Sequence, residues 1–237
     1  MYKLAFLIPY YNHPLKIAKL VKALNSFNQE IIIVDDGSNK ASKQALDGLK
    51  VKVLTRAKNG GKGASLKDGF CFAKELGFSH VFQVDADFQH DISFCEEFIS
   101  KSMQNPNAII AANPIYDEFA PKSRLYGRKI TNFWNAINTL SLDIKDGMCG
   151  FRIYPVDEIC SILPSVKSDR MEFDIEILIR SYRRGIKLFW LDLKVAYEDD
   201  GVSHFRMLRD NLLISKMHAR LFFSLPSYIF KVLKSAK

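Results

Sequence analysis

Short apolar runs rich in β-branched residues alternate with amphipathic stretches through the first half of this chain. The runs have the length of strands, and the stretches near 14–26, 62–76 and 91–103 have helical spacing. Continuous apolar strands joined by helices predict an α/β fold with a doubly wound, mainly parallel sheet that is covered on both faces. The expected strands cover residues 4–8, 31–34, 51–54, 81–84 and 108–112.

The alternation weakens after about residue 113. There we expect a long helix over 123–142, a helix near 172–184, a strand over 186–196 and a terminal helix from about 203. No repeat, low-complexity segment or Pro/Gly-rich linker divides the chain. We therefore predict a single domain over residues 1–201, followed by a basic amphipathic helical segment over 202–237 that packs on the domain or on a membrane.

The charge of the chain is concentrated in that terminal segment. The whole chain carries 34 Lys and Arg against 26 Asp and Glu, a net +8, and residues 202–237 account for +6 of it. The remainder is close to neutral, which argues against a general polyanion-binding surface and predicts no nucleic-acid partner. An anionic membrane surface is a candidate partner for the terminal segment alone.

Two further features concern the cellular setting. No run reaches the roughly 18 apolar residues that a membrane span requires, and the first residues lead into a strand instead of a signal peptide. We expect a cytoplasmic protein, with peripheral association at the inner face of the membrane as the alternative. The cysteines are scattered without a C-x-x-C pair, so we expect buried thiols instead of a zinc site or disulfides. They are Cys71, Cys95, Cys149 and Cys160.

Two carboxylates and an amide follow the fourth expected strand. Asp85 and Asp87 alternate along the chain, so an extended backbone points both side chains toward one face. With Gln89 they offer the oxygen ligands that Mg²⁺ or Mn²⁺ prefers, and a metal there could bridge a diphosphate. The alternative is a solvated turn whose acids cap the next helix.

Polar clusters also follow the first and second strands, at 9–12 and 35–38. Ligands of such sheets bind beyond the carboxyl ends of strands, so these clusters should meet Asp85 and Asp87 at one edge. Asp35 or Asp36 could accept hydrogen bonds from a nucleobase or ribose, although a segment of this kind is by itself more often a turn.

A glycine-rich basic segment at 56–63 precedes an expected helix. Its setting suits an anionic group at the helix N-terminus, and a tight loop explains the glycines equally well. The spacings of a P-loop and of G-x-G-x-x-G are absent, which argues against a nucleoside triphosphatase and a dinucleotide oxidoreductase.

Five segments in order resemble family 2 glycosyltransferases with a GT-A fold, and the pattern is similar to that of the dolichyl- or polyprenyl-phosphate sugar synthases. The resemblance covers about residues 3–185. The segments are Ile8-Pro9-Tyr10-Tyr11-Asn12, Ile33-Val34-Asp35-Asp36-Gly37-Ser38, Asn59-Gly60-Gly61-Lys62-Gly63, Val84-Asp85-Ala86-Asp87-Phe88-Gln89-His90 and Cys149-Gly150-Phe151-Arg152.

The resemblance implies a metal-dependent, inverting transfer of a sugar from a nucleotide-diphosphate sugar to a lipid or lipid-linked acceptor. Transfer to a soluble glycan, or an inactive nucleotide-sugar binding protein, are the alternatives. The implied donor site comprises Pro9, Tyr11, Asp35, Asp36 and Lys62 around the nucleotide, Asp85, Ala86, Asp87 and Gln89 around the metal and diphosphate, and Arg152 near the donor or acceptor phosphate.

The sequence departs from the family pattern at two places. His13 stands where a Glu is frequent, and residues 112–114 replace a frequent Gly-Ser-Arg. Arg124 and Arg128 are then the nearest candidates for the missing phosphate-binding cation. Two Arg four residues apart on a helix are otherwise simply solvated.

The acceptor side depends on the nucleophile. A hydroxyl acceptor needs a base, for which Asp174 is our candidate, whereas a lipid phosphate is already ionised and needs none. Acids at this helix start, where Glu172 and Glu176 also lie, equally complement the helix dipole. In the segment before the terminal helix, His204 and Arg206 could reach the diphosphate. The apolar, aromatic residues 221–230 would dock on an anionic bilayer or pack on the domain.

Overall fold

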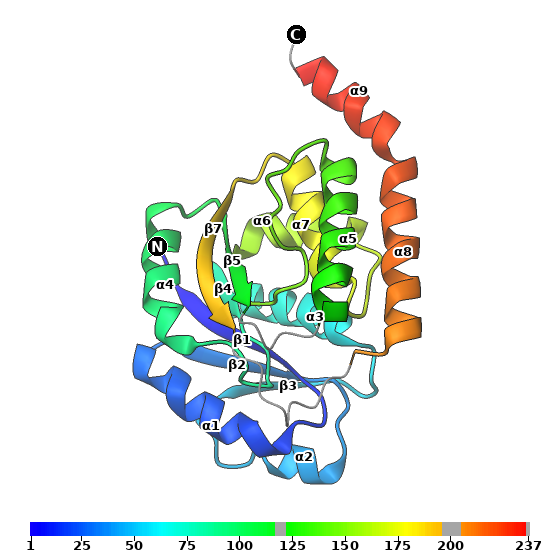
Figure 1. The fold of residues 1–237 in the computed structure, drawn as a ribbon. Coiled ribbons are helices and arrows are strands. Elements are labelled where there is room, and N and C mark those ends of the chain that lie inside the picture. The colour runs from blue at the N-terminus through cyan, green and yellow to red at the C-terminus, as the bar shows by residue number, and fades with distance from the viewer. Residues whose placement is uncertain (117–121, 196–204, 236–237) are drawn as a thin grey trace.

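A seven-stranded sheet organises the computed structural model, which describes residues 1–116, 122–195 and 205–235 (Figure 1). The strand order is β3-β2-β1-β4-β6-β5-β7, so the chain winds outward from β1 in both directions. This confirms the predicted doubly wound α/β arrangement. The strands are β1 (Leu4–Tyr10), β2 (Glu30–Asp35), β3 (Lys52–Thr55), β4 (His80–Gln83), β5 (Ile109–Tyr116), β6 (Arg152–Pro155) and β7 (Leu188–Val195).

One strand runs against its neighbours. β6 pairs antiparallel with both β4 and β5, whereas the other pairs of the sheet are parallel. The sequence did not predict β6, because it is four residues long and begins with the charged Arg152. The sheet is nevertheless mainly parallel, as expected.

Helices cover both faces of the sheet, and the long ones lie where the sequence predicts them. Two short helices, α2 and α6, were not predicted because too few residues show a periodicity. The helices are α1 (Pro14–Leu24), α2 (Lys40–Gln44), α3 (Lys62–Glu75), α4 (Cys95–Gln104), α5 (Lys122–Thr139), α6 (Val156–Ile162), α7 (Phe173–Arg183), α8 (Met207–Phe223) and α9 (Leu225–Ser235).

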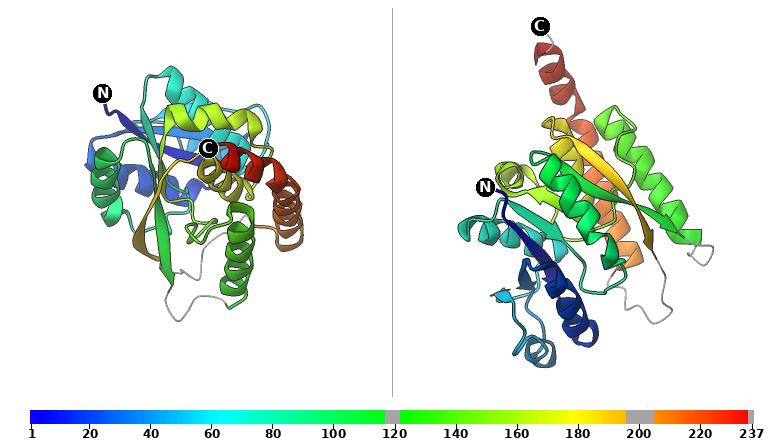
Figure 2. Two further views of the ribbon diagram at one scale, coloured as in Figure 1. Left: turned by 90° about the horizontal axis from the view of Figure 1, so that it is seen from above. Right: turned by 90° about the vertical axis from the view of Figure 1, so that its left-hand side faces the viewer.

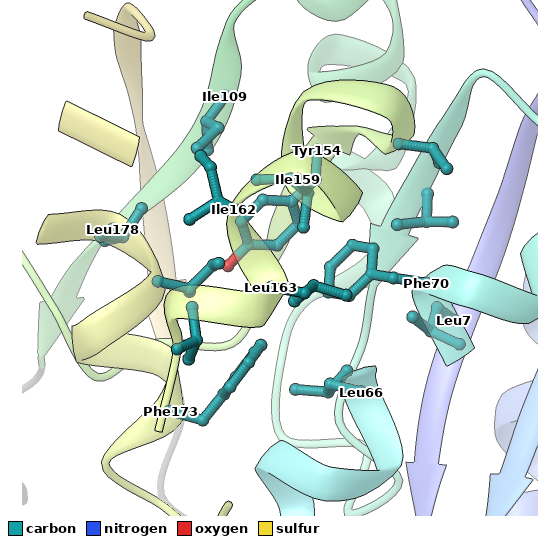
Figure 3. Packing of buried hydrophobic residues seen from close by; sticks show 14 of the residues in the cluster. Leu7, Leu66, Phe70, Ile109, Tyr154, Ile159, Ile162, Leu163, Phe173 and Leu178 are labelled. Carbon is teal, nitrogen blue, oxygen red and sulfur yellow. The ribbon is translucent and has the colours of Figure 1, made fainter. Parts of the chain in front are cut away.

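Successive residues of β1 enter different cores. Phe6 and Ile8 pack with residues of α1 and α4, whereas Ala5 and Leu7 pack with α3, α6 and α7 on the other face. Figure 3 shows part of this second core, in which the ring of Phe70 lies edge-on to Tyr154 at 5.3 Å between centroids. Burial on both faces explains the continuous apolar runs.

The terminal segment forms two helices instead of one. α8 begins at Met207 and ends at Phe223, and α9 then projects beyond the body (Figure 2). Of the described helices, none is long and apolar enough to cross a membrane. The expectation of buried thiols is wrong for Cys71, which is exposed on α3, and Cys160 is only partly buried.

A buried carboxylate ties α8 to the domain. Glu176 of α7 is fully buried, and its Oε2 accepts a hydrogen bond from Arg220 of α8 at 2.6 Å, while Oε1 accepts one from Arg180 at 2.6 Å. Burial alone would raise the pKa of Glu176, but a hydrogen bond from Ser168 and both guanidinium charges hold it lowered. The ionised carboxylate therefore fixes α8 on α7.

Protonation of His218 should destabilise the α5–α8 contact. Its ring is 3% exposed, stacks on Trp134 and accepts a hydrogen bond from Asn138, and burial lowers its pKa to about 4. Unfolded His titrates near 6.5, so only the unfolded chain gains a proton as the pH falls from 6.5 to 4, and stability is lost in that window. Between pH 7.5 and 5 we expect a loss of about 2 kcal/mol from this group.

Urea denaturation at the two pH values measures this loss. His218→Phe keeps an aromatic ring on Trp134 and removes the titration, so the variant should show a pH dependence smaller by that amount. An equal pH dependence in both proteins would contradict the assignment.

Candidate active site

A cavity of about 570 Å³ opens where the carboxyl ends of β1, β2 and β4 meet the first halves of α3, α5 and α8. The parallel register explains the convergence, because Tyr10 pairs with Asp35 and Leu7 pairs with Gln83. The predicted site residues that line this cavity are Pro9, Tyr11, Asp36, Lys62, Asp85, Ala86, Asp87, Gln89, Arg128, Asp174 and Arg206.

Two predicted residues lie elsewhere. Asp35 is fully buried, and its Oδ1 accepts a hydrogen bond from the Ser38 amide at 3.0 Å, so it shapes the turn after β2. Arg152 is also fully buried, and the cavity lining does not include it. His204 and the side chain of Arg124 lie outside the described residues.

The guanidinium of Arg152 binds main-chain carbonyls. Its Nη1 donates to the Asp174 carbonyl at 2.6 Å, and its Nη2 donates to the Asp146 carbonyl at 3.4 Å. Burial alone would lower the pKa of Arg152, but the nearby Tyr154 and Asp174 raise it. In this structure Arg152 supports the backbone behind the cavity, instead of facing a phosphate as the resemblance implied.

Asp36 organises the glycine-rich loop. Its Oδ2 accepts hydrogen bonds from the Gly61 amide at 2.7 Å and from Asn59 at 2.9 Å, and its Oδ1 accepts from the Gly60 amide at 2.9 Å and pairs with Arg56. These amides point at a carboxylate of the protein itself. The loop geometry thus accounts for the glycines without a bound phosphate.

Lys62 joins two carboxylates from distant parts of the chain. It is the first residue of α3, and its Nζ lies 2.7 Å from Asp85 after β4 and 2.8 Å from Asp174 on α7. Burial alone would lower the pKa of Lys62, but the charges of Asp174 and Asp85 outweigh it and the pKa is raised. The same ammonium lowers the pKa of Asp85 against the opposing effect of burial.

The second oxygen of Asp174 is also engaged. Gln83 on β4 donates from Nε2 to Asp174 Oδ1 at 2.9 Å. Gly150 allows this close arrangement, since a Cβ there would lie 2.6 Å from Gln83 and 2.8 Å from both Asp85 and Lys62. A side chain at position 150 would therefore displace the ion pairs.

The carboxylates near β4 are suited to a hard metal ion only in part. Asp85 and Asp87 lie in one cavity with Gln89, and all three carry the oxygen donors that Mg²⁺ and Mn²⁺ prefer. Within the described ranges, no three His, Cys, Asp or Glu side chains are grouped closely enough to hold a metal ion together. A metal held by Asp85 and Asp87 would need further oxygens, such as those of a diphosphate.

Basic side chains also line the cavity. Arg128 of α5 pairs with Asp146 and lies 4.8 Å from the ring centre of Tyr116, while Arg206 and Arg209 come from the start of α8, beside Asp210. The cavity therefore contains cations as well as the acids that follow β2 and β4. An anionic ligand bound there would find positive charge within the same cavity.

Sequence reasoning missed two residues that act on residues of the cavity lining without lining the cavity themselves. His90 contacts the Cys149 thiol at 3.4 Å, and although burial lowers its pKa, Cys149, Asp85 and Asp87 raise it to about 9. Asp146 holds Arg128 and also accepts hydrogen bonds from the amides of Met148 and Cys149. Asp146 lies just before the Cys149–Arg152 segment, and this closeness in sequence was the only feature that could have pointed to it.

The family model "Glycosyl transferase family 2" matches residues 5–158, which is more than half of the chain. This chain belongs to glycosyl transferase family 2. The transferase is 25% identical over 238 residues to a dolichyl-phosphate beta-glucosyltransferase of Dictyostelium discoideum, covering 87% of this chain and 72% of that protein. It is 28% identical to dolichyl-phosphate beta-glucosyltransferase ALG5D of Trichomonas vaginalis, covering 78% of this chain and 63% of that protein.

Solved structures share the fold of the transferase. Glucosyl-3-phosphoglycerate synthase of Mycobacterium tuberculosis superposes with a TM-score of 0.67 at 14% identity, covering 96% of this chain and 80% of that one. S. aureus TarS in complex with UDP-GlcNAc gives 0.60 at 14% identity, covering 92% and 66%. These neighbours are glycosyltransferases, and the fold is GT-A, as the resemblance implied.

Replacing Lys62 should destabilise the transferase. Lys62→Met leaves the Asp85 and Asp174 carboxylates facing each other in a partly closed cavity, and loss of one partner of a buried pair costs about 3–5 kcal/mol. Urea denaturation measures the change.

Lys74→Met is the matched control, because Lys74 lies on the same helix and pairs with the exposed Asp157. We expect little change there. Adding Asp174→Asn to Lys62→Met should recover part of the lost stability, and equal effects of the two methionine variants would refute the role of Lys62.

Proposed function

We propose that this family 2 glycosyltransferase moves a sugar from a nucleotide-diphosphate sugar to a lipid-linked acceptor, with inversion at the anomeric carbon. The observation that supports it is the convergence of the β1, β2 and β4 ends in one cavity, which is lined by Asp36, Asp85 and Asp87 and also by arginines from α5 and the start of α8. The dolichyl-phosphate transferases among its relatives support the lipid-linked acceptor.

The two ends of the cavity suit the two parts of the donor. Pro9, Tyr11 and Asp36 lie at the ends of β1 and β2 and would line the nucleoside, with His13 close by. Asp85 and Asp87, with Gln89, would hold Mg²⁺ or Mn²⁺, whose charge would stabilise the departing diphosphate. Arg128 and Arg206 line the same cavity and would neutralise phosphate oxygens.

The contacts of Asp174 favour an acceptor that is already ionised. Both of its carboxylate oxygens are engaged, by Lys62 and Gln83, and the residue is 2% exposed. For a hydroxyl acceptor Asp174 would be the base, and it would first have to release one of these partners. A lipid phosphate needs no base, so Asp174 can remain the residue that positions Lys62.

The donor chemistry is testable with the purified chain. Incubation with Mn²⁺ and a panel of nucleotide-diphosphate sugars should release nucleoside diphosphate slowly by hydrolysis, and a polyprenyl phosphate should accelerate the release. Asp87→Ala should lower the metal-dependent rate at least about 100-fold, since it removes one of two candidate carboxylate ligands.

Asp91→Ala is the matched control, because Asp91 is exposed and caps the turn at Ser93. Its rate should stay close to that of the parent chain. An unchanged rate in Asp87→Ala would remove Asp87 from the site, and tight nucleotide binding without turnover of any donor would indicate an inactive binding protein.

A further inference from the structure

Three large apolar side chains of α5 form a stripe that faces solvent. Tyr126, Ile130 and Phe133 follow helical spacing and are 65%, 62% and 63% exposed. Large apolar side chains grouped on a surface mark a contact site more often than isolated ones do. The sequence motifs of the transferase do not account for this stripe.

Ring contacts extend the stripe onto α8. Phe133 lies edge-on to Trp134 at 6.1 Å between centroids, Trp134 to Phe222 at 6.3 Å, and Phe222 to Phe223 at 5.8 Å. Phe222 and Phe223 are 43% and 80% exposed. We call the surface formed by Tyr126, Ile130, Phe133, Phe222 and Phe223 the α5–α8 face.

The arrangement of the helices makes this one continuous surface. α5 and α8 pack against each other, and α9 continues from the end of α8 away from the body (Figures 1 and 2). α9 adds further exposed apolar side chains, among them Phe230 at 69% and Leu233 at 62%. An amphipathic helix in such a position is suited to lie in the plane of a membrane interface.

The charges of these helices favour an anionic partner for the α5–α8 face. α5 and α9 contain no acidic residue, and Asp210, the acid of α8, is 4% exposed. Lys129, Lys216 and Lys234 are exposed on the three helices. A second copy of the chain would oppose like charges, whereas anionic lipid headgroups would be attracted to exposed lysines beside apolar bulk.

The face adjoins the cavity, because α5 and α8 contribute to both. The cavity is lined by Gly127, Arg128 and Thr131 of α5 and by Met207, Arg209, Asp210 and Asn211 of α8. We propose that the α5–α8 face docks on an anionic bilayer surface, so that the cavity receives its acceptor from the adjoining headgroup layer. The acceptor part of this inference rests on the proposed function, whereas the docking itself does not.

Sedimentation of the full chain with vesicles tests the docking. Vesicles of phosphatidylcholine mixed with phosphatidylglycerol should bind the protein, and phosphatidylcholine alone should bind it weakly. Ile130→Asp combined with Phe133→Asp should lower the bound-to-free ratio by roughly tenfold or more, because it places charge where apolar side chains enter the interface. Ile130→Ser combined with Phe133→Ser should weaken binding in the same direction.

Leu15→Asp is the control variant, since Leu15 is 90% exposed on α1 and lies outside the face. Its binding should match that of the parent chain, and thermal unfolding should show that all variants fold. Equal binding by the parent and both α5 variants overturns the proposal. Light scattering that shows a dimer of the parent chain and a monomer of the α5 variants, without vesicle binding, also overturns it in favour of a second copy.

Donor hydrolysis without vesicles separates this inference from the proposed function. The α5 variants should hydrolyse donor at the parent rate, because Ile130 and Phe133 do not line the cavity. A chain that hydrolyses donor but does not bind anionic vesicles refutes the docking alone. A chain that binds vesicles through the α5–α8 face and turns over no donor supports the docking and refutes the proposed function.

Discussion

The ion pairs of Lys62 are the interaction on which the active site depends. They join the start of α3, the end of β4 and the start of α7, which are separated by long stretches of sequence. Each carboxylate by itself would be costly to bury, and together they would repel each other. The ammonium between them makes it possible for both Asp85 and the largely buried Asp174 to line the same cavity.

Asp36, another acid of the cavity, is also stabilised by positive partners within the protein. Asp36 is surrounded by the loop that starts at Arg56. The charge of its carboxylate is compensated by the Arg56 guanidinium and by the amides of Gly60 and Gly61. The acids of this cavity are thus held in place by the protein before any ligand binds, which limits the reorganisation that binding requires. A cationic ligand would compete with Lys62 for the carboxylates, whereas an anionic ligand would bind near Arg128 and Arg206.

Much of this arrangement follows from the sequence. The apolar runs predicted where the parallel strands lie in the chain and that the sheet is mainly parallel, and the polar residues after them predicted the edge at which Asp36, Asp85 and Asp87 meet. Arg152 shows where such reasoning stops, because the family resemblance implied a phosphate contact for it. Its burial against the carbonyls of Asp174 and Asp146 depends on tertiary contacts that no local pattern encodes. The sequence did not predict the exposure of the stripe on α5 either, since the spacing of Tyr126, Ile130 and Phe133 also fits a buried helix face.

The reversed direction of β6 has a consequence for how the cavity is enclosed. Parallel strands bring only their carboxyl ends to the ligand edge, and a helix must carry the chain back before the next strand starts. An antiparallel strand starts at that same edge, so the segment entering β6 delivers Cys149 and Gly150 beside the ends of its neighbours. The surroundings of Gly150 leave no room for a side chain, so the backbone itself packs behind Asp85. The transferase thus packs main chain, instead of a side chain, against the Lys62–Asp85 ion pair.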